Sequence, residues 1–251
     1  MIKRIMAIAS LMFSVLLANA QSVDEMVEQA RQLELQMKES DAFEKDKEIL
    51  KIKPDDIRAL TQASQLCSRI GNRQKDKSSK TDYFNQAKTY AQAALKVNPN
   101  SPDANLAMAI AMGRMALISG AKEKVAASKD VKKYAELAIK FNPNLAQAYH
   151  VLGKWNYEVA NLNVFERGAA KMLFGGLPDG SLKNAIANYE KCRQLDPAFI
   201  LNYYELARAY KSNDEQDKAI EVLKKALTLR NISQDDASIK ADCKRMLDDL
   251  Q

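Results

Sequence analysis

Histidine is almost absent from this sequence, since His150 is the only one among 251 residues. Catalytic arrangements that pair a nucleophile with a histidine, and metal sites built from several histidines, have at most this one residue to use. No H-E-x-x-H, G-x-S-x-G or paired-acid motif is present either. We therefore expect no enzyme activity, no catalytic residue, no cofactor and no metal site.

Cysteine is scarce as well, and the three that occur, Cys67, Cys192 and Cys243, are widely spaced. Such an odd and dispersed set forms neither a disulfide framework nor a metal motif of the C-x-x-C type. Two of the three fall at helix-packing positions, where a free cysteine behaves as a small buried hydrophobe. We expect free thiols, and one disulfide formed on export is the alternative.

Glycine and proline are few, with eight and six residues, whereas Ala, Leu, Lys, Glu and Gln dominate. These dominant residues have the best intrinsic helix propensity. Apolar residues make up 47% of the chain and charged residues 28%, so a sizeable core can be buried. The composition predicts an all-α protein.

Long apolar runs are missing after residue 20. The chain begins with M-I-K-R, continues with an apolar run from Ile5 to Leu17, and reaches the small-x-small site Ala18-Asn19-Ala20, which is typical of a secretory signal peptide. No later stretch approaches the roughly 20 apolar residues of a membrane helix. We expect cleavage after Ala20 and an exported, periplasmic or envelope-associated protein with no transmembrane segment in the mature chain. An uncleaved anchor is the alternative.

The sequence also lacks a strong excess of one charge. Removing Lys3 and Arg4 with the signal peptide lowers the formal charge from +6 to +4. Nucleic-acid binders usually concentrate basic residues on one face, often with aromatic residues among them. We therefore do not expect nucleic acid as a partner.

What the sequence does contain is an internal repeat. Four related phrases end in proline: I-L-K-I-K-P at Pro54, A-L-K-V-N-P at Pro99, A-I-K-F-N-P at Pro143 and C-R-Q-L-D-P at Pro197. The residues twelve, five and two positions before each proline fall on one apolar helix face. They are Ala42, Ile49 and Ile52; Ala87, Ala94 and Val97; Val131, Ala138 and Phe141; and Ala185, Cys192 and Leu195.

A second helix is expected after each proline. The positions six, nine, ten and thirteen residues later follow a large, large, small, large pattern, in which the small residue lets two antiparallel helices approach closely. They are Leu60, Ala63, Ser64 and Cys67; Asn105, Met108, Ala109 and Met112; Tyr149, Leu152, Gly153 and Asn156; and Tyr203, Leu206, Ala207 and Tyr210. The pattern resembles the tetratricopeptide repeat, a helix-turn-helix unit of about 34 residues.

The repeats predict one domain over residues 21–251, a right-handed α-solenoid of tetratricopeptide-like units with a C-terminal capping helix. We place the units at about 23–56, 57–101, 102–145, 146–199 and 200–233, and the cap at 235–250. Two units carry lysine-rich insertions, N-R-Q-K-D-K-S-S-K and A-K-E-K-V-A-A-S-K-D, which we expect to be solvated surface loops. The alternative is a basic rim on one edge of the solenoid.

The insertion in the fourth unit is the least regular part of the chain. Residues 175–181, G-G-L-P-D-G-S, have the glycine spacing of a phosphate-binding loop, but the lysine of that motif is absent and Pro178 removes a backbone donor. We instead expect Gly175 and Gly176 to end one helix and Ser181 to cap the next.

Part of this region has a closer resemblance. The stretch L-G-K-W-N-Y-E-V-A-N-L-N from Leu152, then F-E-R-G-A-A-K and A-I-A-N-Y-E-K-C-R-Q-L-D-P, resembles the regulator of microtubule dynamics family. The resemblance implies a helical adaptor with an extended fourth unit, and in some eukaryotic members a lipid-binding or lipid-transferring domain. The export signal argues against carrying over microtubule binding.

The first helices of stacked repeats form a concave surface, which is where solenoids usually bind. Its middle should be apolar and its end basic, which suits a ligand with an acidic group and an apolar body, such as a peptide carboxylate, a fatty acid or a phospholipid. The alternative is that the tyrosines pack and the cations are merely solvated. From the helical register, the expected groove residues are Val27, Arg31, Thr61, Gln65, Leu106, Ile110, His150, Lys154, Tyr157, Leu201, Tyr204, Arg208 and Lys211.

The apolar part of the third insertion offers a second contact surface. The side chains concerned are Phe165, Met172, Leu173 and Phe174. They either fold back and plug one end of the superhelix, which we favour because soluble monomers rarely expose apolar patches, or touch a membrane or a partner protein. The sequence as a whole predicts a non-enzymatic binding protein that scaffolds an envelope complex, and carriage of a phospholipid or fatty acid is the alternative.

Overall fold

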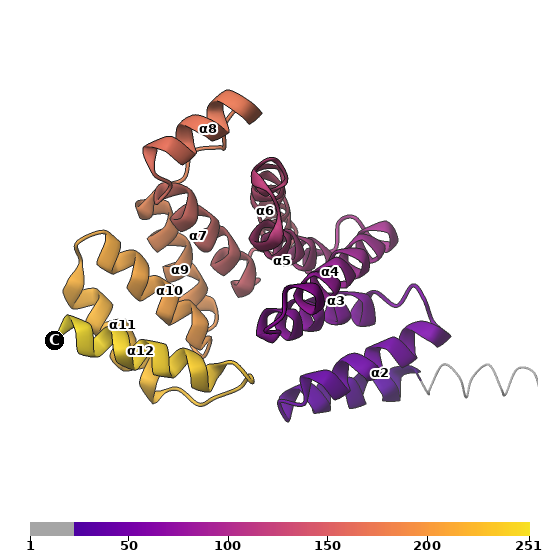
Figure 1. The fold of residues 1–251 in the computed structure, drawn as a ribbon. Coiled ribbons are helices and arrows are strands. Elements are labelled where there is room, and N and C mark those ends of the chain that lie inside the picture. Colours follow the sequence, from indigo (N-terminus) through magenta and orange to yellow (C-terminus); the bar gives the residue numbers. More distant parts are fainter. Residues whose placement is uncertain (1–22) are drawn as a thin grey trace, which may run out of the picture.

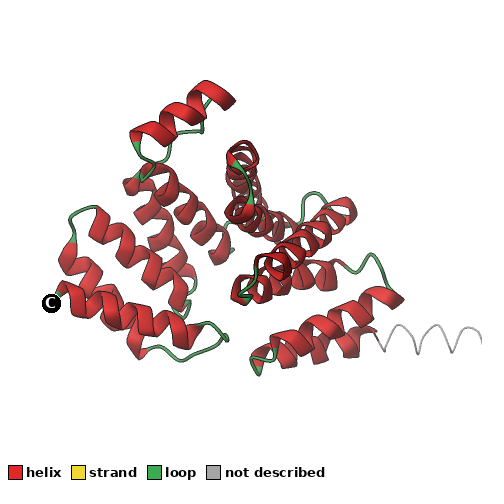
Figure 2. Ribbon diagram, in the orientation of Figure 1, coloured by secondary structure: helices red, strands yellow, loops and turns green. Residues whose placement is uncertain are grey.

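The computed structural model describes residues 23–251, and within them every regular element is a helix (Figures 1 and 2). The described chain starts in a helical segment at 23–35. It continues through α2 (Glu39–Ile52), α3 (Ile57–Arg73), α4 (Lys77–Val97), α5 (Pro102–Ile118), α6 (Ala121–Phe141), α7 (Ala146–Ala160), α8 (Val164–Phe174), α9 (Leu182–Leu195), α10 (Ile200–Ser212), α11 (Gln216–Thr228) and α12 (Asp236–Leu250). The expected signal peptide, residues 1–20, lies outside the described residues.

Neighbouring helices pair and the pairs stack. Each helix from α2 to α7 packs against the next one, α9 packs between α7 and α10, and α10 to α12 continue the stack. The first helices of successive pairs, α3, α5, α7, α10 and α12, also contact one another in that order. Figure 1 shows the result, a superhelix that winds from α2 round to α12. The predicted all-α solenoid is therefore confirmed.

A proline lies in four of the turns that join one helix pair to the next. Helices α2, α4, α6 and α9 all end two residues before a proline, because the residue preceding proline is pushed out of the helical region. At three of these four prolines, the side chain six residues later donates a hydrogen bond to the proline carbonyl. Tyr149 donates to the Pro143 carbonyl at 3.0 Å, Tyr203 to that of Pro197 at 3.0 Å, and Asn105 to that of Pro99 at 2.9 Å.

Two of the three repeat positions before the prolines form the core. The residues twelve and five positions before each proline are buried in every unit, as are the three cysteines, which are unpaired. Burial raises the pKa of the Cys67 thiol to about 12, so this group stays protonated at neutral pH. The position two before the proline lies outside the core, since Ile52 and Val97 are exposed and Phe141 and Leu195 are half-buried.

The lysine-rich insertions are not loops, and that expectation was wrong. Residues 121–130 lie entirely within α6, and of residues 72–80 only 74–76 lie outside α3 and α4. Alanine, lysine and glutamate favour the helix, so these insertions lengthen α4 and α6 to 21 residues each. Asp76 begins α4 by accepting a hydrogen bond from the Ser79 N–H at 2.8 Å.

The third insertion folds as its turn residues predict. Gly175 and Gly176, with φ of 71° and 83°, end α8 in the left-handed region that favours glycine. Ser181 caps α9 by accepting a hydrogen bond from the Asn184 N–H at 3.1 Å. The whole stretch is therefore a helix end, a turn and a helix start.

The segment in front of α12 contacts the first two units. Arg73 at the end of α3 pairs with Asp235 in front of α12, with 3.1 Å between Nη1 and Oδ1, although the two are 162 residues apart. Gln234 also donates to the Met37 carbonyl in the first unit. The buried carboxylate of Glu39 holds Arg73 in place for this contact, because it pairs with both Arg69 and Arg73. Figure 1 shows the loop before α12 approaching α2.

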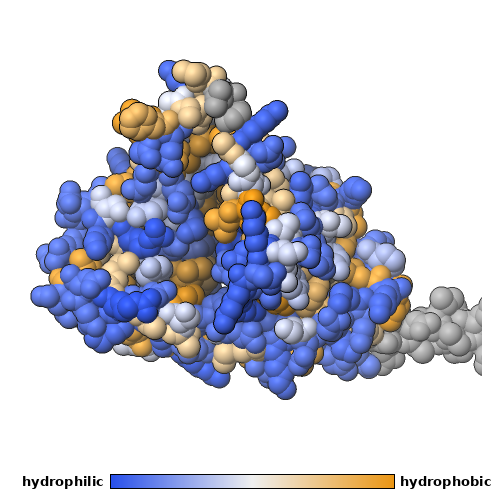
Figure 3. Space-filling model, viewed as in Figure 1, coloured by the Kyte–Doolittle hydropathy of each residue, from blue (hydrophilic) through white to orange (hydrophobic). Residues whose placement is uncertain are grey.

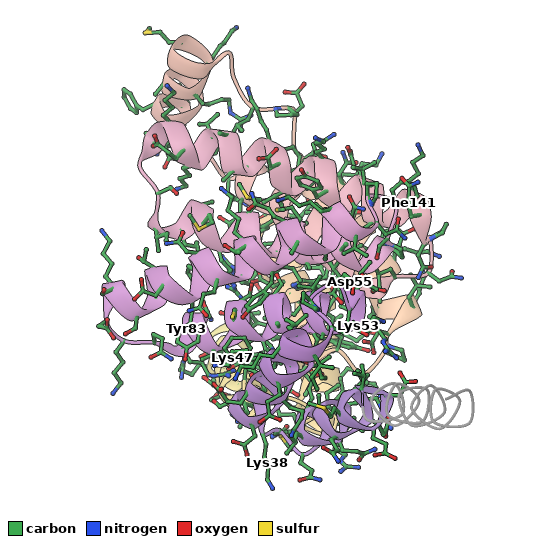
Figure 4. The ribbon with its side chains drawn as sticks, turned by 90° about the vertical axis from the view of Figure 1, so that its right-hand side faces the viewer. Lys38, Lys47, Lys53, Asp55, Tyr83 and Phe141 are labelled. Carbon is green, nitrogen blue, oxygen red and sulfur yellow. The ribbon has the colours of Figure 1, made fainter. Side chains whose placement is uncertain are left out.

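Viewed from the side, the helices form layers (Figure 4). Helix α8 stands at the upper end of this view, and Lys38, just before α2, lies near the lower end. No helix among residues 23–251 is long and apolar enough to cross a membrane.

Candidate binding surface

The candidate site lies on the inner side of the superhelix. There α7 and α10 face α3 and α5 (Figure 1). Figure 3 shows a hollow in the molecular surface at this place, in the middle of the view. Side chains on α7 and α10 form a bonded cluster at its wall, and its members come from residues about 50 positions apart in the sequence.

Glu205 on α10 is the centre of this cluster. Its buried carboxylate accepts from Lys154 Nζ at 2.6 Å and from Arg208 Nη1 at 2.8 Å. Burial alone would favour the neutral acid, but the two cations outweigh it and hold the pKa of Glu205 below its usual value. Glu205 is therefore an anion that fixes the positions of two cations, each partly exposed on the interior wall.

Tyr157 extends the cluster along α7. The Arg208 guanidinium lies 4.8 Å from the centre of the Tyr157 ring, which is the geometry of a cation–π contact. The Tyr157 hydroxyl lies 3.1 Å from the Ser212 hydroxyl at the end of α10. Tyr157 is itself buried, so it supports Arg208 from behind.

His150 is buried rather than displayed on the groove, which corrects the expectation from the helical register. Its ring packs against Phe199 and Tyr189, with centroids 4.9 and 5.6 Å away, and its Nδ1 lies 3.2 Å from Asn202 Oδ1. Burial lowers its pKa to about 4. The side chain is neutral at pH 7 and adds no positive charge to the groove.

The remaining predicted groove residues are divided between surface and core. Lys211 is exposed, and Tyr204 and Ile110 are half-buried on α10 and α5. Leu106 is buried against Ala138 and Ala148, so it is a core residue and its assignment to the groove was wrong. Helical register alone does not distinguish the interior wall from the seam between two neighbouring pairs.

Arg114 on α5 is an interior residue that the sequence reasoning missed. Its Nη1 donates to Asn72 Oδ1 at 3.1 Å, whereas its Nε is buried without a partner among the described residues. Burial lowers the pKa of Arg114, and its charge acts on His150 across the interior. No repeat position marks this arginine, because the repeat pattern follows packing residues only.

Phe165 and Met172 of the third insertion do not plug the superhelix. Phe165 and Met172 on α8 are 88% and 85% exposed, which contradicts the favoured interpretation for these two side chains. The side chains of Leu173 and Phe174 lie outside the described part. A cavity of about 340 Å³ lies beneath α8, between the end of α7 and residues 175–179, with Arg167 and Lys171 at its rim.

Histidine, cysteine and acidic side chains do not gather into a possible metal site anywhere in residues 23–251. The chemistry that the interior does present is that of recognition. It offers fixed cations, hydroxyl groups and a concave wall.

Comparison with known proteins identifies relatives along nearly the whole chain. A family model described as "Regulator of microtubule dynamics protein 1-3" matches residues 26–251. Regulator of microtubule dynamics protein 3 of Xenopus laevis is 29% identical over 185 residues, which are 73% of this chain and 39% of that protein. Regulator of microtubule dynamics protein 1 of Caenorhabditis elegans is 25% identical over 162 residues, covering 64% of this chain and 72% of that protein. The chain spans about two fifths of the length of the vertebrate relatives it matches.

Solved structures support the fold. A thermophilic tetratricopeptide repeat protein of Thermus thermophilus has a TM-score of 0.64 at 16% identity, covering 91% of this chain and 98% of its own. Yeast Tom70 has a TM-score of 0.54 at 15% identity, covering 90% of this chain and 39% of its own. At such low identities the likeness shows the fold alone, a tetratricopeptide-like solenoid.

Proposed function

The chain belongs to the regulator of microtubule dynamics protein 1-3 family, and we propose that it is a non-enzymatic adaptor that scaffolds an envelope protein complex through the interior of its superhelix. The observation that carries this proposal is the pair of cations fixed by Glu205. A single buried carboxylate holds Lys154 and Arg208 on the interior wall, so little side-chain entropy is lost when a partner binds them.

The spare donors of these cations suit a carboxylate on an extended segment of a partner protein. A guanidinium has five donors, and Arg208 contacts one Glu205 oxygen; an ammonium has three, and Lys154 contacts Glu205 at 2.6 Å and Glu158 at 3.6 Å, so both cations keep unused donors. The partly exposed stems of both side chains and the half-buried Tyr204 add apolar surface beside them.

Replacing both cations should weaken partner binding. For the Lys154→Ala/Arg208→Ala variant we expect a loss of roughly tenfold or more, because hydrogen bonds to charged groups contribute about 1.5–3 kcal/mol. The partner is first identified by cross-linking in the envelope fraction, and its affinity is then measured by calorimetry. The matched control is Lys224→Ala/Lys225→Ala, which removes two exposed lysines from the outer helix α11. Equal affinities for native chain and both variants would contradict the proposal.

Arg114 favours the alternative, an acidic ligand with an apolar body such as a phospholipid or fatty acid. Its unpartnered Nε is a buried donor with no acceptor among the described residues, and a carboxylate or phosphate inside the superhelix would satisfy it.

Organic extraction of the protein purified from its own envelope fraction tests this alternative, together with native mass spectrometry. If an acidic lipid is the ligand, Arg114→Gln should lower its recovery roughly tenfold, because one charge-assisted hydrogen bond is lost. Arg245→Gln, at an exposed arginine of α12, is the control and should retain the lipid. A protein that carries no lipid, or equal recovery from both variants, leaves the scaffold as the function.

A further inference from the structure

Helix α8 carries the most exposed apolar side chains of the described chain. Eight large hydrophobic side chains are exposed among those that the structure describes in residues 23–251. The three with the highest exposed fractions all belong to α8: Val164 with 84%, Phe165 with 88% and Met172 with 85%. Figure 3 shows the hydrophobic colour at the top of the view where α8 lies, and Figure 4 shows this helix at the upper end of the stack. A patch of this kind on one short helix indicates a contact surface.

The exposed face is continuous. Phe165 and Met172 are seven residues apart, two helical turns, and so lie on the same side of α8. Gly168 and Ala169 lie between them on this side of the helix and have no large side chain that could separate the two. The space around Gly168 is open, since a Cβ added there would meet no atom within 4 Å. The two large side chains are therefore free to enter an apolar phase together.

Helix α8 is held with this face outward. Asn163 and Glu166 form a capping box, with 2.8 Å from the Glu166 N–H to Asn163 Oδ1 and 2.9 Å for the reciprocal bond. Arg167 donates to the Val159 carbonyl at 3.2 Å, and Ala170 is the residue that α8 buries. Because α8 is already ordered in the free protein, little further conformational entropy is lost when this surface binds.

The surroundings of α8 are basic. It packs beside α6, whose first three turns, together with α8, contain five basic and three acidic residues. Lys122 and Lys124 on α6 and Lys171 on α8 are exposed, and none of these three has an ion pair among the described residues. An apolar strip on a short helix, with unpaired lysines around it, is the pattern of a helix that lies in a membrane interface.

We propose that α8 docks the protein on an anionic lipid bilayer, with Phe165 and Met172 entering the acyl region and Lys122, Lys124 and Lys171 meeting the headgroups. A protein partner fits less well, because a stable interface needs about 800 Å² on each side, and an eleven-residue helix with three large apolar side chains provides only part of that. The bilayer supplies both the apolar phase and the negative charge.

Tryptophan quenching by brominated lipids tests the proposal at the residue itself. Phe165→Trp and the control Ile52→Trp, at an exposed apolar residue of α2, are made in the full chain, and Trp155 gives the same buried background in both. The probe is vesicles of brominated phosphatidylcholine mixed with phosphatidylserine. We expect the Phe165→Trp emission to be quenched and shifted to the blue, and the Ile52→Trp emission to stay unchanged.

Two further variants report on the two parts of the surface. Met172→Ser should weaken vesicle binding of the Phe165→Trp chain roughly tenfold, since a buried apolar side chain is lost from the bilayer. Lys122→Gln/Lys124→Gln should weaken it roughly fivefold for each lysine removed. Absent quenching at residue 165, equal quenching at residues 165 and 52, quenching that is as strong on neutral vesicles, or an emission shift that depends on protein concentration without vesicles would each overturn the proposal.

Discussion

Replacing Asp46 with asparagine is expected to abolish a fall in the free energy of unfolding that the native chain shows between about pH 6.5 and pH 8. Asp46 lies on α2 with 2% of its surface exposed. Burial, reinforced by the charges of Glu34 and Asp56, raises its pKa from 3.8 to about 8. Its Oδ2 has no hydrogen-bond partner among the described residues, so ionisation leaves an uncompensated charge inside the protein.

The direction of the effect follows from proton linkage. Between pH 3.8 and about 8 the native state keeps the Asp46 proton that the unfolded state has lost, so rising pH favours unfolding. His150 acts in the opposite direction below its unfolded pKa of 6.5, because burial lowers its native pKa to about 4. The two slopes offset each other below pH 6.5, and the Asp46 slope dominates above it.

The expected loss is about 1 kcal/mol over these 1.5 pH units, because the slope of roughly 1.4 kcal/mol per unit declines as Asp46 ionises near pH 8 and is partly offset by His150 near pH 6.5. Urea unfolding at pH 6.5 and pH 8 measures it directly. Asp46→Asn should show equal stability at both values, and at pH 8 it should be more stable than the native chain. Asp41→Asn, at an exposed residue of the same helix, is the control and should retain the native slope. A native chain that is equally stable at both pH values would contradict the expectation.

Gly153→Val should lower the free energy of unfolding by about 3 kcal/mol, the upper part of the range for overpacking a core. A Cβ at residue 153 would lie 2.8 Å from Cδ1 of the Tyr189 ring, closer than atoms can approach. Tyr189 is fully buried on α9, so its ring has no open space to enter. The substitution forces α7 and α9 apart, which also disturbs the contact of His150 with the Tyr189 ring.

Gly168→Val provides the matched comparison, because residue 168 is also a helical glycine but has nothing within 4 Å of its Cβ position. This variant should stay within about 0.5 kcal/mol of the native chain, as surface substitutions usually do. Both values come from urea unfolding at one pH. Similar losses at the two glycines would show that close packing against Tyr189 does not determine the effect at residue 153.

The sequence predicts those parts of the fold that depend on local chemistry. Proline ends four helices, glycine in the left-handed region ends α8, and Ser181 starts α9, each as expected from the residue alone. The buried small residues at the tenth position, including Ser64 and Gly153, were also identified, because two packed helices demand them. The lysine-rich insertions misled the prediction, since charged segments of high helix propensity can extend a helix as readily as form a loop.

The site was only partly predictable, because its chemistry depends on contacts between distant residues. Lys154 and Arg208 were identified as groove residues, but Glu205, which joins them, was not. The Glu205–Arg208 pair is local, three residues apart, whereas Lys154 is 51 residues away, and no pattern in the sequence links the two. Likewise, burial of His150 follows from the packing of Phe199 and Tyr189 around it.

The contact between Arg73 and Asp235 can form only with the present number of repeat units between these two residues. In an open repeat array each unit touches only its neighbours, so units can be gained or lost one at a time and the ends can unfold independently. Here the loop before the last helix is bonded to the first two units, at Met37 and Arg73. One extra unit would carry that loop past its partners, so growth by duplication is closed to this chain. Unfolding of α12 therefore also removes bonds made by the first two units of the chain.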